Sequence, residues 1–118
     1  MAIQSLADFQ STFSCNPVEV DIEIKGMDAL TVYLKPLTSA QRDAFEASVV
    51  GTEGKRDLRN LRARLVADCL VDEKGEAIGT AKDLGNLDAR FVGTVFDKVR
   101  ELNGMDADDE NEGELGKE

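Results

Sequence analysis

Two short runs of alternating apolar and polar residues constrain the fold of this chain more than any other feature of its sequence. Their apolar members are Val18, Val20, Ile22, Ile24, Leu30, Val32 and Leu34. Successive side chains of a strand point to opposite faces, so this period of two indicates strands with one buried face. Gly26 between the runs and Pro36 after the second favour a β-hairpin.

After the hairpin the apolar period becomes helical. Thr38 and Gln41 fit a capping box, in which each side chain satisfies a backbone group at a helix start, and they predict a helix over 39–50. The expected inner face of this helix consists of Ala40, Ala44, Phe45 and Val49. A second helix is predicted over 55–71, and its apolar stripe consists of Leu58, Leu61, Leu65 and Cys69. The sequence Asp-Glu-Lys-Gly at 72–75 predicts a turn after it.

The last third of the chain predicts two more helical segments. Thr80 and Asp83 offer a second capping signature for a short helical turn, and Asp88 is the expected cap of a longer helix. The wide apolar stripe of that helix consists of Phe91, Val92, Val95, Phe96, Val99 and Leu102. Asn103 and Gly104 form a suitable helix stop.

The start of the chain carries a shorter apolar pattern. Ile3, Leu6, Phe9 and Phe13 are spaced by three, three and four residues. This spacing predicts a short amphipathic helix or a packed arm.

The order of these elements predicts an α+β fold, with an N-terminal β-hairpin followed by three to four packed helices. A chain of 118 residues has the length of one domain, and we assign residues 1–104 to it. Residues 105–118 contain seven acidic residues and one lysine, which give −6 of the net charge of −10. We predict that this segment is a disordered acidic tail, because it has little apolar surface to bury.

Several kinds of chemistry are missing from the sequence. There is no histidine to act as a base, and Cys15 and Cys69 are too far apart in sequence to suggest a zinc motif. We find no phosphate-binding or dinucleotide-binding motif. The carboxylates fall in turns, helix caps and strand faces, where they are ordinarily structural. The sequence therefore predicts a protein that is not an enzyme and that uses no metal or cofactor, with Cys69 as a small buried apolar residue.

The apolar runs are only a few residues long, whereas a membrane-spanning helix needs about 20. Residues 1–13 lack the basic start and apolar middle of a secretory signal. We therefore expect a cytoplasmic protein without a membrane partner.

A basic stretch interrupts the acidic trend. It consists of Lys55, Arg56, Arg59, Arg62 and Arg64. No aromatic residues are interleaved with these cations, and the surrounding negative charge would oppose binding to nucleic acid. The stretch is either a solvated helix face or a docking surface for an acidic partner or a second copy. The docking hypothesis pairs Arg56, Arg59 and Arg62 of one copy with the acidic strand face of another, formed by Glu19, Asp21 and Glu23.

The order of features also resembles a known family. The segments LTSAQRDAFE, CLVDEKGEAI and VRELNG, within residues 17–104, are similar to the tail assembly chaperones of lambda-like long-tailed bacteriophages. The resemblance implies a protein of the host cytoplasm that binds the tape measure protein and tail tube subunits during tail building and is absent from the finished virion. It also implies self-association and a longer fusion form made by programmed ribosomal frameshifting.

Two other classes remain as alternatives. An acidic inhibitor that mimics the charge of DNA would need negative charge spread over a rigid surface, whereas most of the excess charge here lies in the predicted tail. A small hydrolase working through two carboxylates would need a positioned nucleophile or base, and the sequence offers neither.

Overall fold

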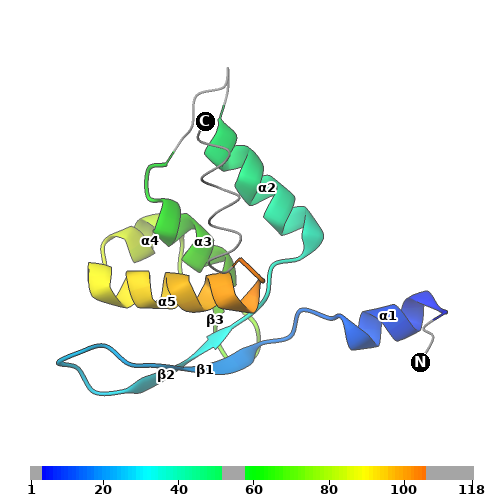
Figure 1. The fold of residues 1–118 in the computed structure, drawn as a ribbon, viewed down its shortest axis with the longest axis horizontal. Helices are drawn as coiled ribbons and strands as arrows, with labels where there is room; N and C mark the ends of the chain where they lie inside the picture. The colour runs from blue at the N-terminus through cyan, green and yellow to red at the C-terminus, as the bar shows by residue number, and fades with distance from the viewer. Residues whose placement is uncertain (1–3, 52–57, 106–118) are drawn as a thin grey trace.

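The fold is α+β, as the sequence predicts: a small antiparallel sheet lies against a layer of helices, and a short N-terminal helix projects to one side (Figure 1). The computed structural model describes residues 4–51 and 58–105. In chain order the elements are α1 (Leu6–Thr12), β1 (Val18–Ile22), β2 (Leu30–Leu34), α2 (Ser39–Val50), α3 (Leu61–Cys69), β3 (Leu70–Val71), α4 (Ala81–Gly85) and α5 (Ala89–Leu102).

The predicted hairpin is confirmed. β1 and β2 pair antiparallel, with Val18 opposite Leu34 and Ile22 opposite Leu30. The alternation gives the sheet one inner and one outer face, since Ile22 and Leu34 are fully buried while Glu19 and Asp21 are exposed. The inner face is buried mainly where it meets the helices, and Leu30, near the hairpin loop, remains 38% exposed.

The sheet has a third strand that the sequence patterns did not predict. β3 pairs antiparallel with β2, with Leu70 opposite Leu34. The predicted helix over 55–71 is therefore wrong at its end: Leu70 is extended, and Lys35 N donates to Cys69 O at 2.8 Å. The predicted turn at 72–75 is confirmed, because the Asp72 carboxylate accepts hydrogen bonds from the backbone at 74 and 76.

That helix also begins later than expected. Residues 55–57 of the predicted range lie outside the described part of the chain, and Leu58 precedes the helix. α3 begins at Leu61, after Asn60 adopts a left-handed conformation with φ 51°. Asparagine tolerates this conformation better than most residues, so Asn60 marks the turn into α3.

The remaining helix starts agree with their predicted caps. Thr38 and Thr80 form complete capping boxes with Gln41 and Asp83, and the Asp88 carboxylate accepts a hydrogen bond from Arg90 N. α5 buries Val92, Val95 and Val99 against α3 and the sheet. α2 is different, because none of its residues is buried. Of its predicted inner face, Phe45 packs against the core, whereas Ala40 and Ala44 are exposed and Val49 is half-buried.

Asn103, which caps the end of α5, joins three segments. Its Oδ1 accepts a hydrogen bond from Leu37 N at 2.8 Å, and its Nδ2 donates to Val99 O at 2.9 Å. Arg42 of α2 donates to its carbonyl oxygen at 3.3 Å. The Cys15 thiol lies 3.6 Å from Leu37 O, so the segment leading from α1 reaches the body at the same place.

The body extends one residue beyond the predicted boundary at 104. Met105 N donates to Arg100 O at 2.7 Å, and the half-buried Met105 side chain packs against the core. The rest of the predicted tail, residues 106–118, lies outside the described residues. Within residues 4–51 and 58–105, no helix combines the length and the apolar character needed to cross a bilayer.

Candidate protein-binding surfaces

A groove lies in the helical layer, where α3, α4 and α5 meet. It encloses about 420 Å³. Its walls come from the first turn of α3, the end of α4 and the first half of α5, and they are formed by Leu58, Asn60, Leu61, Arg62, Ala63, Leu84, Gly85, Leu87, Ala89, Val92 and Phe96. Leu58 and Leu87 are 49% and 50% exposed, so apolar surface reaches the rim. A concave surface with apolar residues at its rim suits an apolar side chain of a partner.

The groove forms because two loops place apolar residues beside the packed helices. Leu58 comes from the turn before α3, and Leu87 comes from the turn between α4 and α5. A Cβ built at Gly85 would lie 3.7 Å from the Asn60 side chain, which is an ordinary van der Waals contact. The end of α4 and the turn before α3 therefore lie side by side at this wall of the groove.

Phe96 contributes an aromatic ring to the groove, and two cations lie over this ring. The guanidinium carbons of Arg62 and Arg100 are 5.7 Å and 5.6 Å from the ring centroid. Cation–π contacts of this length are attractive and hold both side chains against Phe96. Arg62 therefore adds a positive charge to a groove whose lining is both polar and apolar.

A second apolar surface lies on α1. Leu6, Phe9 and Phe13 are 72%, 45% and 69% exposed, and no residue of α1 is buried. The rings of Phe9 and Phe13 stack with their centroids 6.2 Å apart. We name residues 4–14, with this apolar face, the arm. The sequence predicts a short helix or a packed arm at this position, and the structure confirms the helix but leaves Leu6, Phe9 and Phe13 exposed. Ile3, the first residue of the predicted apolar pattern, lies outside the described residues.

The outer face of the sheet is polar and acidic. The Tyr33 hydroxyl donates to a Glu19 carboxylate oxygen at 3.0 Å, and the Thr31 hydroxyl donates to Asp21 at 2.9 Å. The Glu19 carboxylate also raises the pKa of Tyr33, because it accepts the phenolic proton and repels a phenolate. Two of the three predicted acidic contact residues are therefore already engaged by their own sheet.

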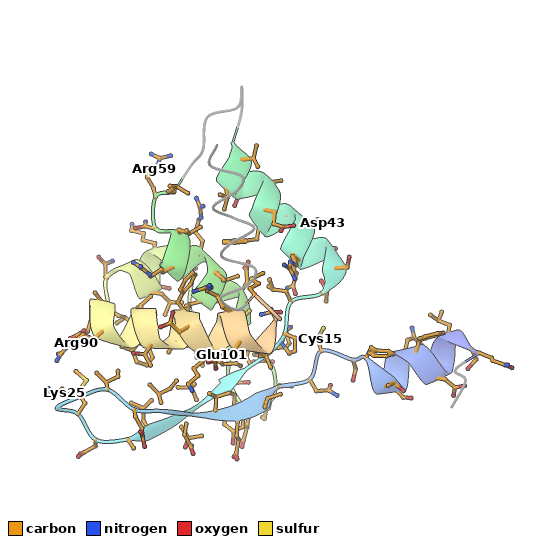
Figure 2. The ribbon with its side chains drawn as sticks, viewed as in Figure 1. Cys15, Lys25, Asp43, Arg59, Arg90 and Glu101 are labelled. Carbon is orange, nitrogen blue, oxygen red and sulfur yellow. The ribbon has the colours of Figure 1, made fainter. Side chains whose placement is uncertain are left out.

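The predicted cationic residues are distributed differently. Arg56 lies outside the described residues, and Arg59 stands in the turn before α3 (Figure 2). Arg62 lies on α3 and lines, together with Glu23, a shallow hollow between the hairpin tip and the start of α5. Lys25 and Arg90 also line this hollow and lie at the same end of the molecule (Figure 2). The structure thus brings Arg62 and Glu23 to one surface of a single chain, where the sequence hypothesis placed them in different copies.

The Cys69 thiol is buried and not available for chemistry. Cys69 is fully buried, and burial raises the pKa of its thiol to about 11, so it is protonated at neutral pH. Cys69 is thus the buried apolar residue that the sequence predicts. In the part of the chain that the structure describes, no three histidine, cysteine or carboxylate side chains gather where they could hold a metal ion.

The sequence patterns did not predict the groove. Leu58 and Phe96 belong to two separate predicted helix stripes, and Leu87 belongs to neither. A groove between three elements depends on how they pack, which periodicity in one element does not report. Comparisons of the chain with family models, curated proteins and solved structures gave no match.

Proposed function

We propose that this protein is a binding protein without catalytic activity, which acts as a tail assembly chaperone of a long-tailed bacteriophage. In this role it binds the tape measure protein and tail tube subunits in the host cytoplasm, associates with further copies of itself, and does not remain in the finished virion. It needs no metal or cofactor for this work. The longer fusion form made by ribosomal frameshifting belongs to the same proposal.

The observation that carries the proposal is the amount of apolar side chain that the small body leaves exposed. In the described ranges, ten large apolar side chains are between 38% and 72% exposed, including three on the arm and two at the rim of the groove. Single exposed apolar residues are normal, but apolar residues gathered on an uncovered helix and around a groove mark a protein-binding surface. An assembly chaperone needs such surfaces, because it must cover apolar parts of a client until they meet their final partners.

The alternative of a DNA-mimicking inhibitor has weaker support. Its charges would have to stand on a rigid surface in place of phosphates. The rigid acidic surface in the described residues is the outer sheet face, where Glu19 and Asp21 accept hydrogen bonds from their own strand partner. Among the described residues, the arm carries the single charge of Asp8 and the groove lining carries that of Arg62, and neither surface would have a role in charge mimicry.

Affinity purification of the tagged protein from phage-infected cells tests the proposal. We expect the tape measure protein of the same phage to be recovered with it, identified by mass spectrometry. Recovery of a host nuclease or polymerase in its place would support the DNA mimic, and recovery of no phage structural protein would contradict the chaperone role.

A matched variant separates the two classes further. Neutralising the acidic sheet face by Glu19→Gln, Asp21→Asn and Glu23→Gln should leave recovery of the tape measure protein unchanged, since the apolar surfaces remain. The same variant should lose a DNA-binding partner, whose cationic site depends on the carboxylates. Loss of the tape measure protein from this variant would contradict binding through apolar surface.

A further inference from the structure

β2 has a full-length partner on one side and a short partner on the other. All five of its residues pair with β1, whereas β3 pairs with its last two residues only. The chain leaves the sheet after Val71, because Asp72 N donates to Glu76 O at 2.9 Å and closes a tight turn. Within the described residues, no strand therefore pairs with the β3 side of residues 30–32, the part of β2 nearest the hairpin loop (Figure 1).

This open edge exposes the backbone hydrogen-bonding groups of Thr31. Lys35 N donates to Cys69 O at 2.8 Å, so the backbone groups of Lys35 face β3. Residues of an antiparallel strand alternate in the side to which they bond, so the backbone groups of Tyr33 and Thr31 face the same way. Tyr33 lies opposite Val71 in the ladder, but β3 ends before it reaches Thr31. The N–H and C=O of Thr31 are thus available to a further strand.

A small pocket lies at the same edge. It encloses about 290 Å³ and is lined by Thr31, Val32, Tyr33, Leu70, Val71, Asp72, Ile78 and Phe91. Ile78 is 56% exposed, and Val32 and Phe91 are only partly buried against the core. Open backbone groups beside a pocket for an alternate side chain are the two features by which a sheet edge binds an extended peptide. The pocket therefore favours an apolar residue on the inner face of an added strand.

The outer face of the sheet beside this edge is acidic. Asp21 accepts a hydrogen bond from the Thr31 hydroxyl at 2.9 Å, and Glu19 accepts one from the Tyr33 hydroxyl at 3.0 Å. Residues 72–76, which directly follow β3, add three carboxylates and one lysine. Opposite charges on neighbouring strands attract each other. A side chain of an added strand on the outer face is therefore favoured when it is basic.

We propose that the open edge of β2 is a strand-addition site, which binds an extended segment of a partner protein in which apolar and basic residues alternate. The segment lies antiparallel to β2, because it extends the ladder that β3 begins. Its backbone bonds to the N–H and C=O of Thr31. Its apolar residues lie on the inner face beside Ile78 and Phe91, and its basic residues lie on the outer face beside Asp21.

The free edge of β1 is less suited to the same contact. The alternation along β1 leaves the backbone groups of Glu19 and Asp21 on its outer edge. Charged residues on an edge strand are a common protection against pairing with another chain. The open position of β2 is Thr31, an uncharged β-branched residue of the kind enriched in strands.

This site differs from the arm and the groove, and it does not depend on the chaperone role. The proposal defines the chemistry of the bound segment, and its test uses purified protein and synthetic peptides without any phage protein. Failure of the test would leave the proposed function standing, and failure to recover the tape measure protein would leave this site standing. Because the open edge is short, it offers few hydrogen bonds and binding is weak.

Nuclear magnetic resonance of the ¹⁵N-labelled full-length protein tests the site. The probe is a seven-residue peptide of alternating lysine and valine with blocked ends. Binding should shift the amide signal of Thr31 and slow its hydrogen exchange at least about tenfold at saturation, because the amide gains a hydrogen-bond partner. Protection at Glu19 and Asp21 in place of Thr31 would move the peptide to β1 and overturn the proposed location. A peptide that does not bind would overturn the site.

Two methylated peptides separate strand addition from simple charge attraction. The residue opposite Thr31 lies on the outer face and bonds to β2, so the lysine nitrogens of the peptide face β2 and the valine nitrogens face away. Methylation of the lysine backbone nitrogens should raise the dissociation constant at least about tenfold. The same number of methyl groups on valine backbone nitrogens should leave it unchanged within about twofold. Equal binding of the two methylated peptides would overturn the proposal, because charge and apolar content are the same in both.

A pair of protein variants tests the pocket. Ile78→Asp places a charge at the pocket and should raise the dissociation constant of the unmethylated peptide at least about tenfold. Val50→Asp is the matched control, because Val50 is 57% exposed at the end of α2, and it should bind like the unsubstituted protein. Both positions are more than half exposed, so both variants should keep the melting temperature of the unsubstituted protein. Equal affinity of the two variants would contradict insertion of an apolar side chain beside Ile78.

Discussion

α1 and α5 are both amphipathic helices with a side-chain cap, but α5 is packed into the core and α1 is not. Ser5 accepts a hydrogen bond from Asp8 N at the start of α1, as Asp88 does from Arg90 N at the start of α5. α5 buries Val92, Val95 and Val99 between α3 and the sheet. α1 buries none of its residues.

The difference shows that an apolar stripe predicts a helix but does not say what covers it. Most of the stability of a short helix in a protein comes from the packing of its apolar face. α5 obtains that packing within the chain and so forms part of the fold. α1 lies on the far side of Pro17, to one side of the body, and no described residue buries its apolar face (Figure 1).

The largest effect should come from the core beside α5. Leu65 of α3 is 1% exposed, and Leu65→Ala should lower the free energy of unfolding by about 2–5 kcal/mol, because it removes packing and leaves a cavity. Leu6→Ala makes the same chemical change on α1, where the side chain is 72% exposed, and should change it by less than about 0.5 kcal/mol. Urea denaturation of dilute protein measures both.

Similar losses for the two substitutions would contradict this comparison. They would show that α1 packs against the body in the monomer. The m-value should stay constant in both variants, since neither substitution changes how much surface unfolding exposes.

Local chemistry made most of the body predictable from the sequence. The alternation from Val18 to Leu34 identified the hairpin, and the capping residues at Thr38, Thr80 and Asp88 located three helix starts. In each case a few neighbouring residues carry the whole signal, because hydrogen bonds at caps and the pleat of a strand are local.

The predictions from the sequence were wrong where contacts between residues far apart in the chain decide the structure. Leu70 and Val71 continue the apolar pattern of α3, but pairing with β2 draws them into the sheet. Ala40 and Ala44 have suitable helical spacing, yet α2 leans away from the core and leaves them exposed. The groove could not be predicted either, because Leu58, Leu87 and Phe96 meet only after three elements have packed.

The next largest loss of stability should come from Asn103, whose hydrogen bonds join the end of α5 to the segment before α2. Asn103→Ala removes the acceptor of Leu37 N and the donor to Val99 O at a half-buried site, so it should lower the free energy of unfolding by about 1–3 kcal/mol. Asn86 is the corresponding cap of α4, where its side chain donates to Lys82 O in an exposed position. Thermal denaturation should show a smaller loss for Asn86→Ala, and an equal loss would mean that Asn103 acts only as a helix cap.

The buried Cys69 thiol should make the stability of the folded protein depend on pH. Burial raises the pKa of the thiol from 9.0 to about 11, so the folded state holds its proton more tightly than the unfolded state. The sign follows from this difference: the stabilisation is complete below the unfolded pKa of 9.0 and is lost as the pH rises toward about 11. At about pH 10 the loss should be about 1 kcal/mol.

Other groups also titrate in this pH range, so the effect of Cys69 has to be measured as the difference in unfolding free energy between the unsubstituted protein and a variant without the thiol. Cys69→Ala removes the thiol and should lose less stability than the unsubstituted protein between about pH 8 and 10. Parallel pH profiles for the two proteins would contradict the assignment to Cys69.

The smallest loss of stability should come from the C-terminal end of the body. Unlike the apolar residues of the arm, the last apolar residue of the body packs against the core. Met105 is half-buried against the core, and its backbone N–H donates to Arg100 O. A chain that ends at Gly104 should lose about 1 kcal/mol, or roughly 4 °C in melting temperature, relative to one that ends at Met105. Met105→Ala in the full chain is the matched control, since it removes most of the same contact without creating a new carboxylate beside α5.

A chain that ends at Met105 should have the same melting temperature as the full chain, because Leu115 is the single large apolar residue of the acidic segment 106–118. A lower melting temperature for that chain would show that residues 106–118 stabilise the body, and the contrast between a packed C-terminal end and an uncovered N-terminal arm would then extend further along the chain than Met105.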